Sequence, residues 1–126
     1  MPVAHVTFGT NDLDRGAAFY DAVMAEFGGN RTFAHDRAIG WSFPDGGPSI
    51  GITYPFDGEV ANRGNGTMFA LMASGEDQVR RVHAAALAHG GSCEGAPGPR
   101  ANGFFAAYFR DPDGNKMNAF CVPATS

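Results

Sequence analysis

Residues 111–115 read Asp-Pro-Asp-Gly-Asn, and residues 43–47 read Phe-Pro-Asp-Gly-Gly. Both stretches place proline, aspartate and glycine in an order that is typical of a tight turn between two strands. The two Pro-Asp-Gly triplets stand 68 positions apart in a chain of 126 residues. A short apolar run follows each triplet, so each half of the chain is predicted to end in a turn and a final strand.

The residues around the first turn predict one strand, one helix and three further strands. Residues 4–8 are β-rich, and Asn11 and Asp12 are residue types that begin helices. Gly28-Gly29 supplies the left-handed conformation that ends a helix. Between these limits, apolar residues at spacings of three and four positions form one helical face: Leu13, Ala17, Tyr20, Met24 and Phe27. The later strands are predicted at 32–34, 39–43 and 49–54.

The second half has the same order of features. A strand is predicted at 67–73, and Ser74 with Asp77 resembles a capping box at the start of a helix. Gly90-Gly91 then ends the helix, as Gly28-Gly29 does in the first half. Two more strands are predicted at 104–109 and 117–122, whereas residues 92–103 show no periodicity and are expected to form a loop. The chain is therefore interpreted as a duplicated β-α-β-β-β module.

The repeat sets the expected domain organisation. Module one covers residues 1–57, a linker rich in glycine, asparagine and charge covers about 58–66, and module two covers 67–126. Each half is too small for its own core, so we expect the two modules to pack together as a single α+β domain. The chain has 18 glycines, about twice the usual share, because a duplicated architecture needs its turn residues twice.

Charge and cysteine content exclude several classes of partner. The net charge is −4 and the nine basic residues are scattered, so neither nucleic acid nor an anionic membrane is expected as a partner. No apolar run is long enough for a membrane span, and the first residues lack the pattern of a signal peptide. Cys93 and Cys121 show no Cys-x-x-Cys spacing and are expected to be reduced thiols. These features favour a cytoplasmic protein.

Several short motifs resemble one known family. They are His-Val-Thr at 5–7, Asn-Asp-Leu at 11–13, Phe-Tyr-Asp-Ala-Val at 19–23, Gly-Ala-Pro-Gly-Pro-Arg at 95–100 and Tyr-Phe-Arg-Asp-Pro-Asp-Gly-Asn-Lys at 108–116. Together they resemble the vicinal oxygen chelate superfamily, which includes glyoxalase I, bleomycin- and fosfomycin-resistance proteins and extradiol dioxygenases. The resemblance implies that the two modules form an open mixed β-barrel with a central cleft and with the helices outside.

The same resemblance implies four metal-ligand positions, on the first and last strands of each module. In this chain they fall on His5, on Gly51 or its less favoured neighbour Ser49, on Met68 and on Asn118. Divalent metals of this kind prefer imidazole and carboxylate ligands, and His5 alone provides one. We therefore expect a degenerate metal site and no cofactor, with a divalent metal disfavoured.

Strand alternation places His5, Thr53, Met68, Asn118 and Phe120 on the face that would line the cleft. The chain has 11 phenylalanines, three tyrosines and one tryptophan, so an aromatic wall is expected. A cleft of this kind suits a small hydrophobic or aromatic molecule. The candidate substrate-binding residues are His5, Trp41, Phe43, Thr53, Met68, Arg100, Tyr108, Asn118 and Phe120.

The predicted cleft and its degenerate metal positions are compatible with two functions. The first is a metal-free module that sequesters a small molecule, as bleomycin-resistance proteins do. The second is an enzyme similar to lactoylglutathione lyase or to a dioxygenase, in which His5 works with unusual metal ligands or as a metal-free acid–base group. His35, His83 and His89 are expected to be solvated or packed. Most proteins of the resembled family pair, so a homodimer is expected, with the modules completed either within one chain or by exchange.

Overall fold

The computed structural model describes residues 2–123 and contains the predicted module twice. Module one consists of β1 (His5–Gly9), α1 (Leu13–Ala25), β2 (Asn30–Ala34), β3 (Ala38–Ser42) and β4 (Ser49–Thr53). Module two consists of β5 (Met68–Met72), α2 (Glu76–Ala88), β6 (Ser92–Pro99), β7 (Phe105–Arg110) and β8 (Lys116–Cys121). The order β-α-β-β-β in each half is confirmed.

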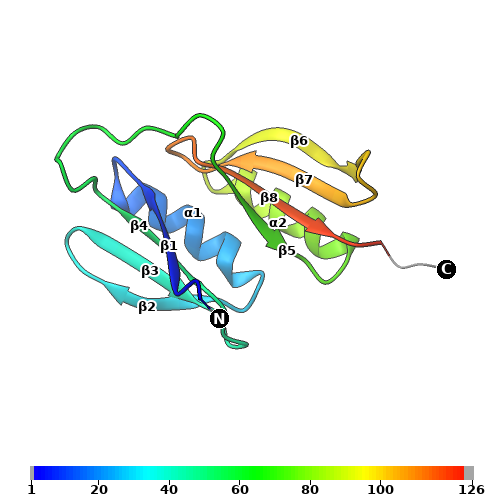
Figure 1. Ribbon diagram of the computed structural model, residues 1–126, viewed down its shortest axis with the longest axis horizontal. Coiled ribbons are helices and arrows are strands. Elements are labelled where there is room, and N and C mark those ends of the chain that lie inside the picture. Colours follow the sequence, from blue (N-terminus) through cyan, green and yellow to red (C-terminus); the bar gives the residue numbers. More distant parts are fainter. Residues whose placement is uncertain (1, 124–126) are drawn as a thin grey trace.

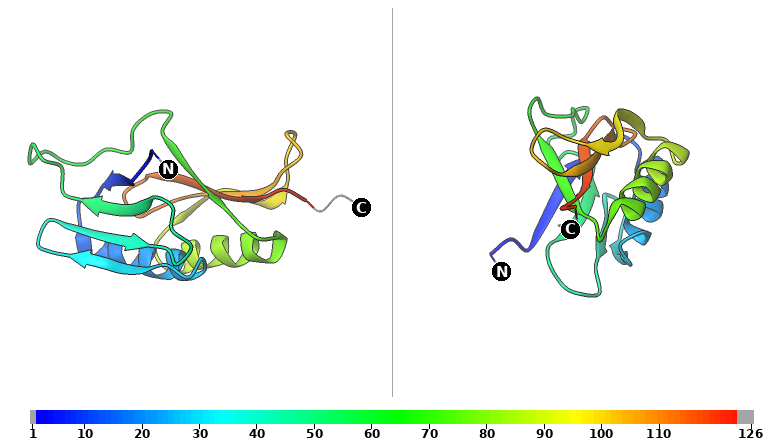
Figure 2. Two further views of the ribbon diagram at one scale, coloured as in Figure 1. Left: turned by 60° about the horizontal axis from the view of Figure 1, so that its bottom comes forward. Right: turned by 90° about the vertical axis from the view of Figure 1, so that its right-hand side faces the viewer.

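Each module forms one four-stranded mixed sheet. The strand orders are β1-β4-β3-β2 and β5-β8-β7-β6, with the first pair of each sheet parallel and the other pairs antiparallel. The two sheets lie side by side along the long axis of the molecule (Figure 1), and both helices lie on one side of the sheets (Figure 2). The predicted α+β fold is confirmed, and the sheets are open rather than closed into a barrel.

Glycine ends both helices in the same way. The Gly29 N–H donates to the Met24 carbonyl at 2.9 Å, and the Gly91 N–H donates to the Ala86 carbonyl at 2.8 Å. The glycine before each donor has a positive φ, 75° at position 28 and 97° at position 90, which a residue with a Cβ rarely adopts. The predicted Gly-Gly helix stops are therefore confirmed at both positions.

The two helices begin differently. The Asp12 side chain caps α1 by accepting from the Arg15 N–H at 3.0 Å, as the residue type predicts. The capping box predicted at the start of α2 is wrong, because Gly75 is the N-cap and no side chain caps it. Instead, the Gln78 amide accepts from the Ser74 N–H and donates to the Glu26 carbonyl, both at 2.7 Å. Gln78 thereby joins the start of α2 to the end of α1.

The loop predicted at 92–103 is wrong in its first part, because residues 92–99 form β6. Two prolines and two glycines lower the strand propensity of this stretch, and its pairing with β7 has register shifts on both sides of Gly95. β6 is also an edge strand, where proline is tolerated. The pairing with β7 determines the conformation of β6. Because that pairing is irregular, apolar and polar residues do not alternate along β6, and the sequence does not indicate a strand.

One hydrophobic core spans both modules. Phe19 and Tyr20 of α1 are fully buried and pack edge-on against each other, with ring centroids 5.0 Å apart. Phe19 also approaches Phe109 of β7 at 6.3 Å, and Phe8 of β1 approaches Phe69 of β5 at 5.7 Å. These contacts cross from one module to the other, so the modules depend on each other for burial.

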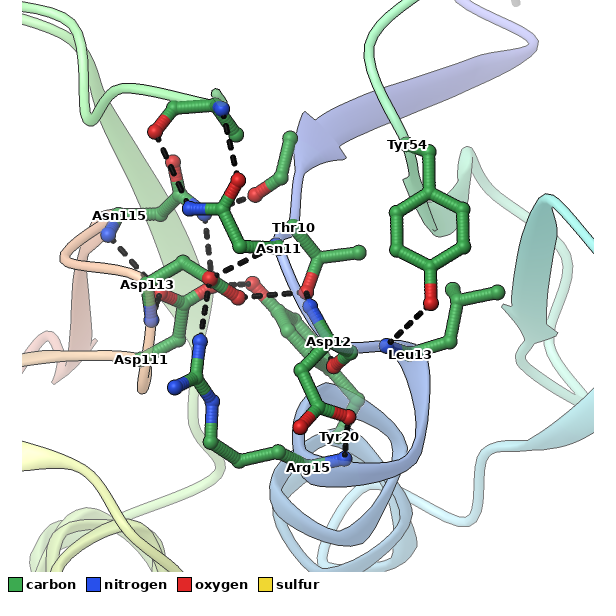
Figure 3. Close-up of polar contacts among 12 residues, drawn as sticks. Thr10, Asn11, Asp12, Leu13, Arg15, Tyr20, Tyr54, Asp111, Asp113 and Asn115 are labelled. Carbon is green, nitrogen blue, oxygen red and sulfur yellow. Dashed lines mark hydrogen bonds and ion pairs between the residues drawn. The ribbon is translucent and has the colours of Figure 1, made fainter. Parts of the chain in front are cut away.

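The Asp-Pro-Asp-Gly-Asn turn of module two binds the start of α1 in module one (Figure 3). The Asp113 carboxylate accepts from the Thr10 hydroxyl at 2.6 Å, the Asn11 N–H at 2.9 Å and the Arg15 guanidinium at 2.6 Å. The Asn115 amide donates to the Gly9 carbonyl at 3.0 Å. The equivalent aspartate of the first turn, Asp45, is exposed. We call the contacts of Asp113 and Asn115 the inter-module latch.

Asp111 occupies the buried side of the same turn. The Tyr20 hydroxyl donates to its carboxylate at 2.7 Å, and the Asn115 side chain and the Asn115 and Asp113 N–H groups also donate to it. Burial raises the pKa of Asp111, while these hydrogen bonds oppose that rise. Burial and the neighbouring Asp111 carboxylate raise the pKa of Tyr20 well above its usual value. Because every group in this cluster is paired, the cluster is a structural junction.

Candidate functional site

Strand alternation exposes one polar face of module one. In β1, Phe8 is buried toward the core, whereas His5 and Thr7 are exposed on the opposite side. β4 runs parallel to β1 and pairs His5 with Ser49 and Thr7 with Gly51. The two strands therefore present hydroxyl groups, one imidazole and one glycine on the same face.

This face forms the floor of a pocket of about 390 Å³, which we call the module-one pocket. Its lining combines four hydroxyl groups, two imidazoles and apolar side chains. The lining residues are Ala4, His5, Thr7, Thr32, Phe33, His35, Ala38, Ser49, Ile50, Gly51, Ile52 and Thr53. The volume lies within the range of small-molecule sites in proteins, and so does the mixture of apolar walls with a few polar groups.

Two glycines make room for the aromatic side of the pocket. The Phe33 ring lies against Gly40, where an added Cβ would be 2.2 Å from the nearest ring carbon. The ring stacks on the His35 imidazole, with centroids 5.8 Å apart and planes at 21°, and the Phe33 side chain is 48% exposed. A Cβ at Gly51 would meet no atom closer than 3.4 Å. Because Gly40 has no Cβ, the Phe33 ring can pack directly on its backbone. Because Gly51 has no side chain, the floor of the pocket is open.

Sequence reasoning placed some residues of this pocket and missed others. His5, Gly51 and Thr53 were expected on the inner face, and all three line the pocket. Phe33 and His35 were not among the candidate residues, although a strand was predicted at 32–34 and His35 was expected to be solvated or packed. β2 is an edge strand with a register shift between Arg31 and Phe33, so its residues show no regular alternation.

Two of the candidate aromatic residues lie elsewhere. Trp41 is 1% exposed, and its indole N–H donates to the Asp21 carboxylate at 2.9 Å beneath α1. Trp41 is therefore a core residue, because its position in β3 turns it toward the helix. Phe43 packs against the core and lines a different, smaller pocket with Phe27 and Met72.

The candidates of module two lie on the face of its sheet that points away from α2. Met68 of β5 is 45% exposed, and Asn118 of β8 is 6% exposed with no hydrogen-bond partner for its side-chain oxygen within residues 2–123. Phe120 stacks on Phe104 at 5.0 Å. Tyr108 pairs with Asn118 across β7 and β8. None of these residues lines the module-one pocket, so one chain does not gather the predicted set at a single site.

The Arg100 side chain is hydrogen-bonded to the backbone of the β6–β7 hairpin to which it belongs. Its guanidinium donates to the carbonyls of Gly98 at 2.9 Å and Ala96 at 2.7 Å, and it lies 5.4 Å from the centre of the Tyr108 ring. These contacts hold the twisted part of β6 against β7. Arg100 therefore stabilises the edge of the sheet in module two.

The four family metal positions do not fit a divalent cation. His5 and Gly51 belong to the module-one pocket, whereas Met68 and Asn118 lie on module two. Gly51 has no side chain, Met68 offers a thioether, and Asn118 offers only a neutral amide oxygen. Within the described residues, no three histidine, cysteine or acidic side chains come together.

The comparisons with known proteins agree with this architecture. The chain matches the family model described as Glyoxalase/Bleomycin resistance protein/Dioxygenase superfamily over residues 3–118. It is similar to the crystal structure of a glyoxalase/bleomycin resistance protein from Albidiferax ferrireducens T118. The identity is 37% and the TM-score 0.87, and the match covers 98% of this chain and all of that one.

More distant structures share the fold. A glyoxalase-related enzyme from Fulvimarina pelagi is 24% identical with a TM-score of 0.79, covering 96% of this chain and 88% of that one. The fosfomycin resistance protein FosX from Listeria monocytogenes is 18% identical with a TM-score of 0.72, covering 96% and 93%. None of the curated proteins compared with the chain is significantly similar to it. No helix within residues 2–123 is long and apolar enough to cross a membrane.

Proposed function

Because the chain belongs to the glyoxalase/bleomycin resistance protein/dioxygenase superfamily, we propose that it binds a small hydrophobic or aromatic molecule in the module-one pocket. Binding takes place without a metal ion at the family positions. The observation that carries this proposal is the pocket itself, in which Gly51 replaces a ligand-bearing side chain and leaves room on the floor. The ligand occupies the space where other members of the superfamily would hold their metal.

The lining indicates how such a molecule is held. The exposed ring of Phe33 offers a flat apolar surface, supported from beneath by Gly40 and from one side by His35. The hydroxyl groups of Thr7 and Thr32 lie in the same lining and orient polar substituents of the ligand. Because hydroxyls and imidazoles both donate and accept hydrogen bonds, the pocket suits a neutral molecule with one or two polar groups.

A neutral fluorescent probe, N-phenyl-1-naphthylamine, tests this proposal. The native chain is expected to bind the probe saturably. Gly51→Leu places a branched side chain in the pocket and is expected to weaken binding about tenfold or more. Ala101→Leu, a matched change in the exposed connection before β7, is expected to leave binding unchanged. Equal affinities of all three proteins, with each shown to be folded by its melting temperature, would contradict the assignment of the pocket.

One observation favours a second candidate function. Two imidazoles, His5 and His35, line the same pocket, and a neutral imidazole is a suitable general base near pH 7. In this alternative the bound molecule loses a proton to His5. His5→Ala would then abolish turnover of a substrate while probe binding persists. Metal analysis of protein purified without added metal separates this from a metal-dependent enzyme, in which a stoichiometric metal would be lost with His5→Ala.

We also propose that two copies of the chain form a homodimer. The β5 face that points away from α2 carries Met68 at 45% and Met72 at 70% exposure. The neighbouring side-chain oxygen of Asn118 has no hydrogen-bond partner within residues 2–123. An apolar strand face at the edge of an open sheet is unusual on a free surface. The polar face of module one from a second copy provides both hydroxyl donors and apolar area for it. In such a dimer, the module-one pocket of one copy would lie opposite the module-two face of the other.

A further inference from the structure

A second pocket of about 390 Å³ lies on module two and is rich in positive charge. Arg63, Arg110 and Lys116 line it together with the glycine-rich segment 64–67 and Met68, and its lining contains no carboxylate. We propose that this cation pocket binds the oxyanion group of a small molecule, a carboxylate or a phosphate. It shares no residue with the module-one pocket, so the proposal stands independently of the function proposed above.

Two of the three cationic side chains form no ion pair or hydrogen bond within residues 2–123, although the Lys116 ammonium lies 5.5 Å from the centre of the Tyr108 ring. Within residues 2–123, Arg63 and Lys116 donate to neither a carboxylate nor a carbonyl oxygen. Every other arginine of the chain does, and the pairs and carbonyl contacts involve Arg15, Arg31, Arg37, Arg80, Arg81, Arg100 and Arg110. Arg63 and Lys116, the two cations with neither kind of partner, therefore lie in one pocket of a chain whose net charge is −4. Such a pair attracts a small anion.

Arg110 provides the fixed side of this arrangement. It forms an ion pair with Glu94 and donates to the Gly114 carbonyl at 2.7 Å, so its position is set. The Arg110 hydrogen bond holds the pKa of Glu94 below its usual range, and Lys116 and Arg63 lower it further. Arg110 contacts this carboxylate directly, and with Arg63 and Lys116 in the same lining the three cations carry two positive charges more than Glu94 neutralises.

The backbone of the linker supplies part of the lining, and the Gly64 N–H within it already donates to the Asn62 side chain at 3.1 Å. Gly64 and Gly66 both have positive φ values, 65° and 97°, which turn successive peptide groups in ways that other residues rarely allow. Concave turns of this type with alternating conformations commonly present N–H groups to anions. A Cβ at Gly66 would meet no atom within 4 Å, so the approach to this segment is open. Thr67 adds a hydroxyl group to the lining.

The position of the pocket indicates a small organic anion. Lys116 pairs with Met68 across β8 and β5, and Asn118 follows Lys116 on the same face of β8. A ligand whose oxyanion lies between Arg63 and Lys116 can rest its apolar part on the thioether of Met68. The pocket has room for one such group, and no basic stripe extends from it toward a polymeric anion.

Titration of the full ¹⁵N-labelled chain with sodium phosphate and, separately, with sodium benzoate tests the proposal at constant ionic strength held with sodium chloride. We expect saturable shifts of the Gly64, Gly66 and Thr67 amide signals with at least one of the two probes. Saturation by phosphate alone identifies a phosphate site, and saturation by benzoate alone identifies a carboxylate site. Saturation by both identifies a general oxyanion site.

Arg63→Gln and Lys116→Gln are each expected to weaken binding about tenfold, because each removes one charge-assisted contact. Arg80→Gln removes an exposed cation of α2 and is expected to leave the affinity unchanged. Folding is checked by the melting temperature, which Arg63→Gln should leave in place because Arg63 has no polar partner within the described residues. Absence of saturable shifts with both probes would overturn the proposal, as would affinities that Arg63→Gln and Lys116→Gln leave unchanged.

Discussion

At the scale of single residues, Gly40 determines the shape of the module-one pocket. Gly40→Ala would place a Cβ 2.2 Å from the Phe33 ring, so the ring must move. Because Phe33 is 48% exposed, we expect a small change in unfolding free energy, about 1 kcal/mol or less, but clearly weaker binding of the neutral aromatic probe. Gly51→Ala adds a Cβ to the same pocket but leaves it 3.9 Å from the Phe33 ring, so it is the control for lost pocket volume alone. A larger loss of affinity in Gly51→Ala than in Gly40→Ala would contradict this account of Phe33.

The burial of His83 predicts that the stability of the chain depends on pH. It is 8% exposed, its Nε2 lies 3.3 Å from the Cys93 sulfur, and burial lowers its pKa below the usual 6.5. Between the lowered pKa of the folded state and about pH 6.5, the unfolded chain binds more protons than the folded chain. The contribution of His83 to the unfolding free energy is therefore fully present above about pH 6.5, and it is lost as the pH falls toward the lowered pKa.

Urea unfolding followed by the fluorescence of the single tryptophan, Trp41, measures this effect. The midpoint should fall between about pH 7.5 and about pH 5.5, and His83→Gln should reduce that fall. His89→Gln, a change at an exposed histidine just after α2, should not. An equal reduction in both variants would assign the pH dependence to surface charge.

The residues that could be predicted from the sequence are those set by alternation within a regular strand. His5 and Thr53 stand in strands with a clear period of two, and both line the pocket. Trp41 also follows the alternation, but its face could not be assigned before the position of α1 was known. Phe33 and His35 could not be predicted, because a register shift and a short turn place them at the pocket.

At the scale of elements, the inter-module latch is the contact that the repeat does not explain. Asp113→Ala removes the acceptor for three donors and is expected to cost about 2–3 kcal/mol of unfolding free energy. Asp45→Ala removes the equivalent aspartate of module one, which is exposed, and is expected to cost less than about 0.5 kcal/mol. Urea denaturation measures both. Similar losses would mean that the latch contributes no more than an ordinary turn.

Turns and helix ends could be predicted because their chemistry is local. The Gly-Gly stops at 28–29 and 90–91 and both Pro-Asp-Gly turns lie where the sequence indicates. β6 could not be predicted, since its glycines and prolines disfavour a strand and only the pairing with β7 forms one. The start of α2 lies one residue beyond the position that the predicted Ser74 cap implies, and Gln78 satisfies the backbone there through a contact with α1 that is distant in sequence.

At the scale of the whole molecule, the open sheets predict a homodimer that depends on the face of β5. Met72 is 70% exposed there, and Met72→Glu is expected to shift the sedimentation coefficient from that of a dimer to that of a monomer, because it would bury an unpaired charge. Leu87→Glu replaces an exposed apolar residue of α2 and should leave the dimer intact. A native chain that sediments as a monomer at all concentrations would contradict the dimer proposal.

The side-by-side placement of the modules could not be predicted from either half alone. The sequence indicates a cleft that gathers His5 and Met68, whereas the structure of one chain separates them into two pockets. Contacts between the helices, the latch and the aromatic packing of Phe19 on Phe109 determine this placement. All of them are contacts between residues far apart in the sequence, and the local motifs to which these residues belong do not indicate their partners.

We propose that the module-one pocket binds a small apolar molecule without a metal ion. Titration of N-phenyl-1-naphthylamine before and after dialysis against EDTA tests it most directly. We predict the same saturable binding in both samples, because Gly51, Met68 and Asn118 leave His5 as the only strong metal ligand among the four family positions. Loss of binding after dialysis, with recovery on addition of manganese or zinc, would contradict the claim.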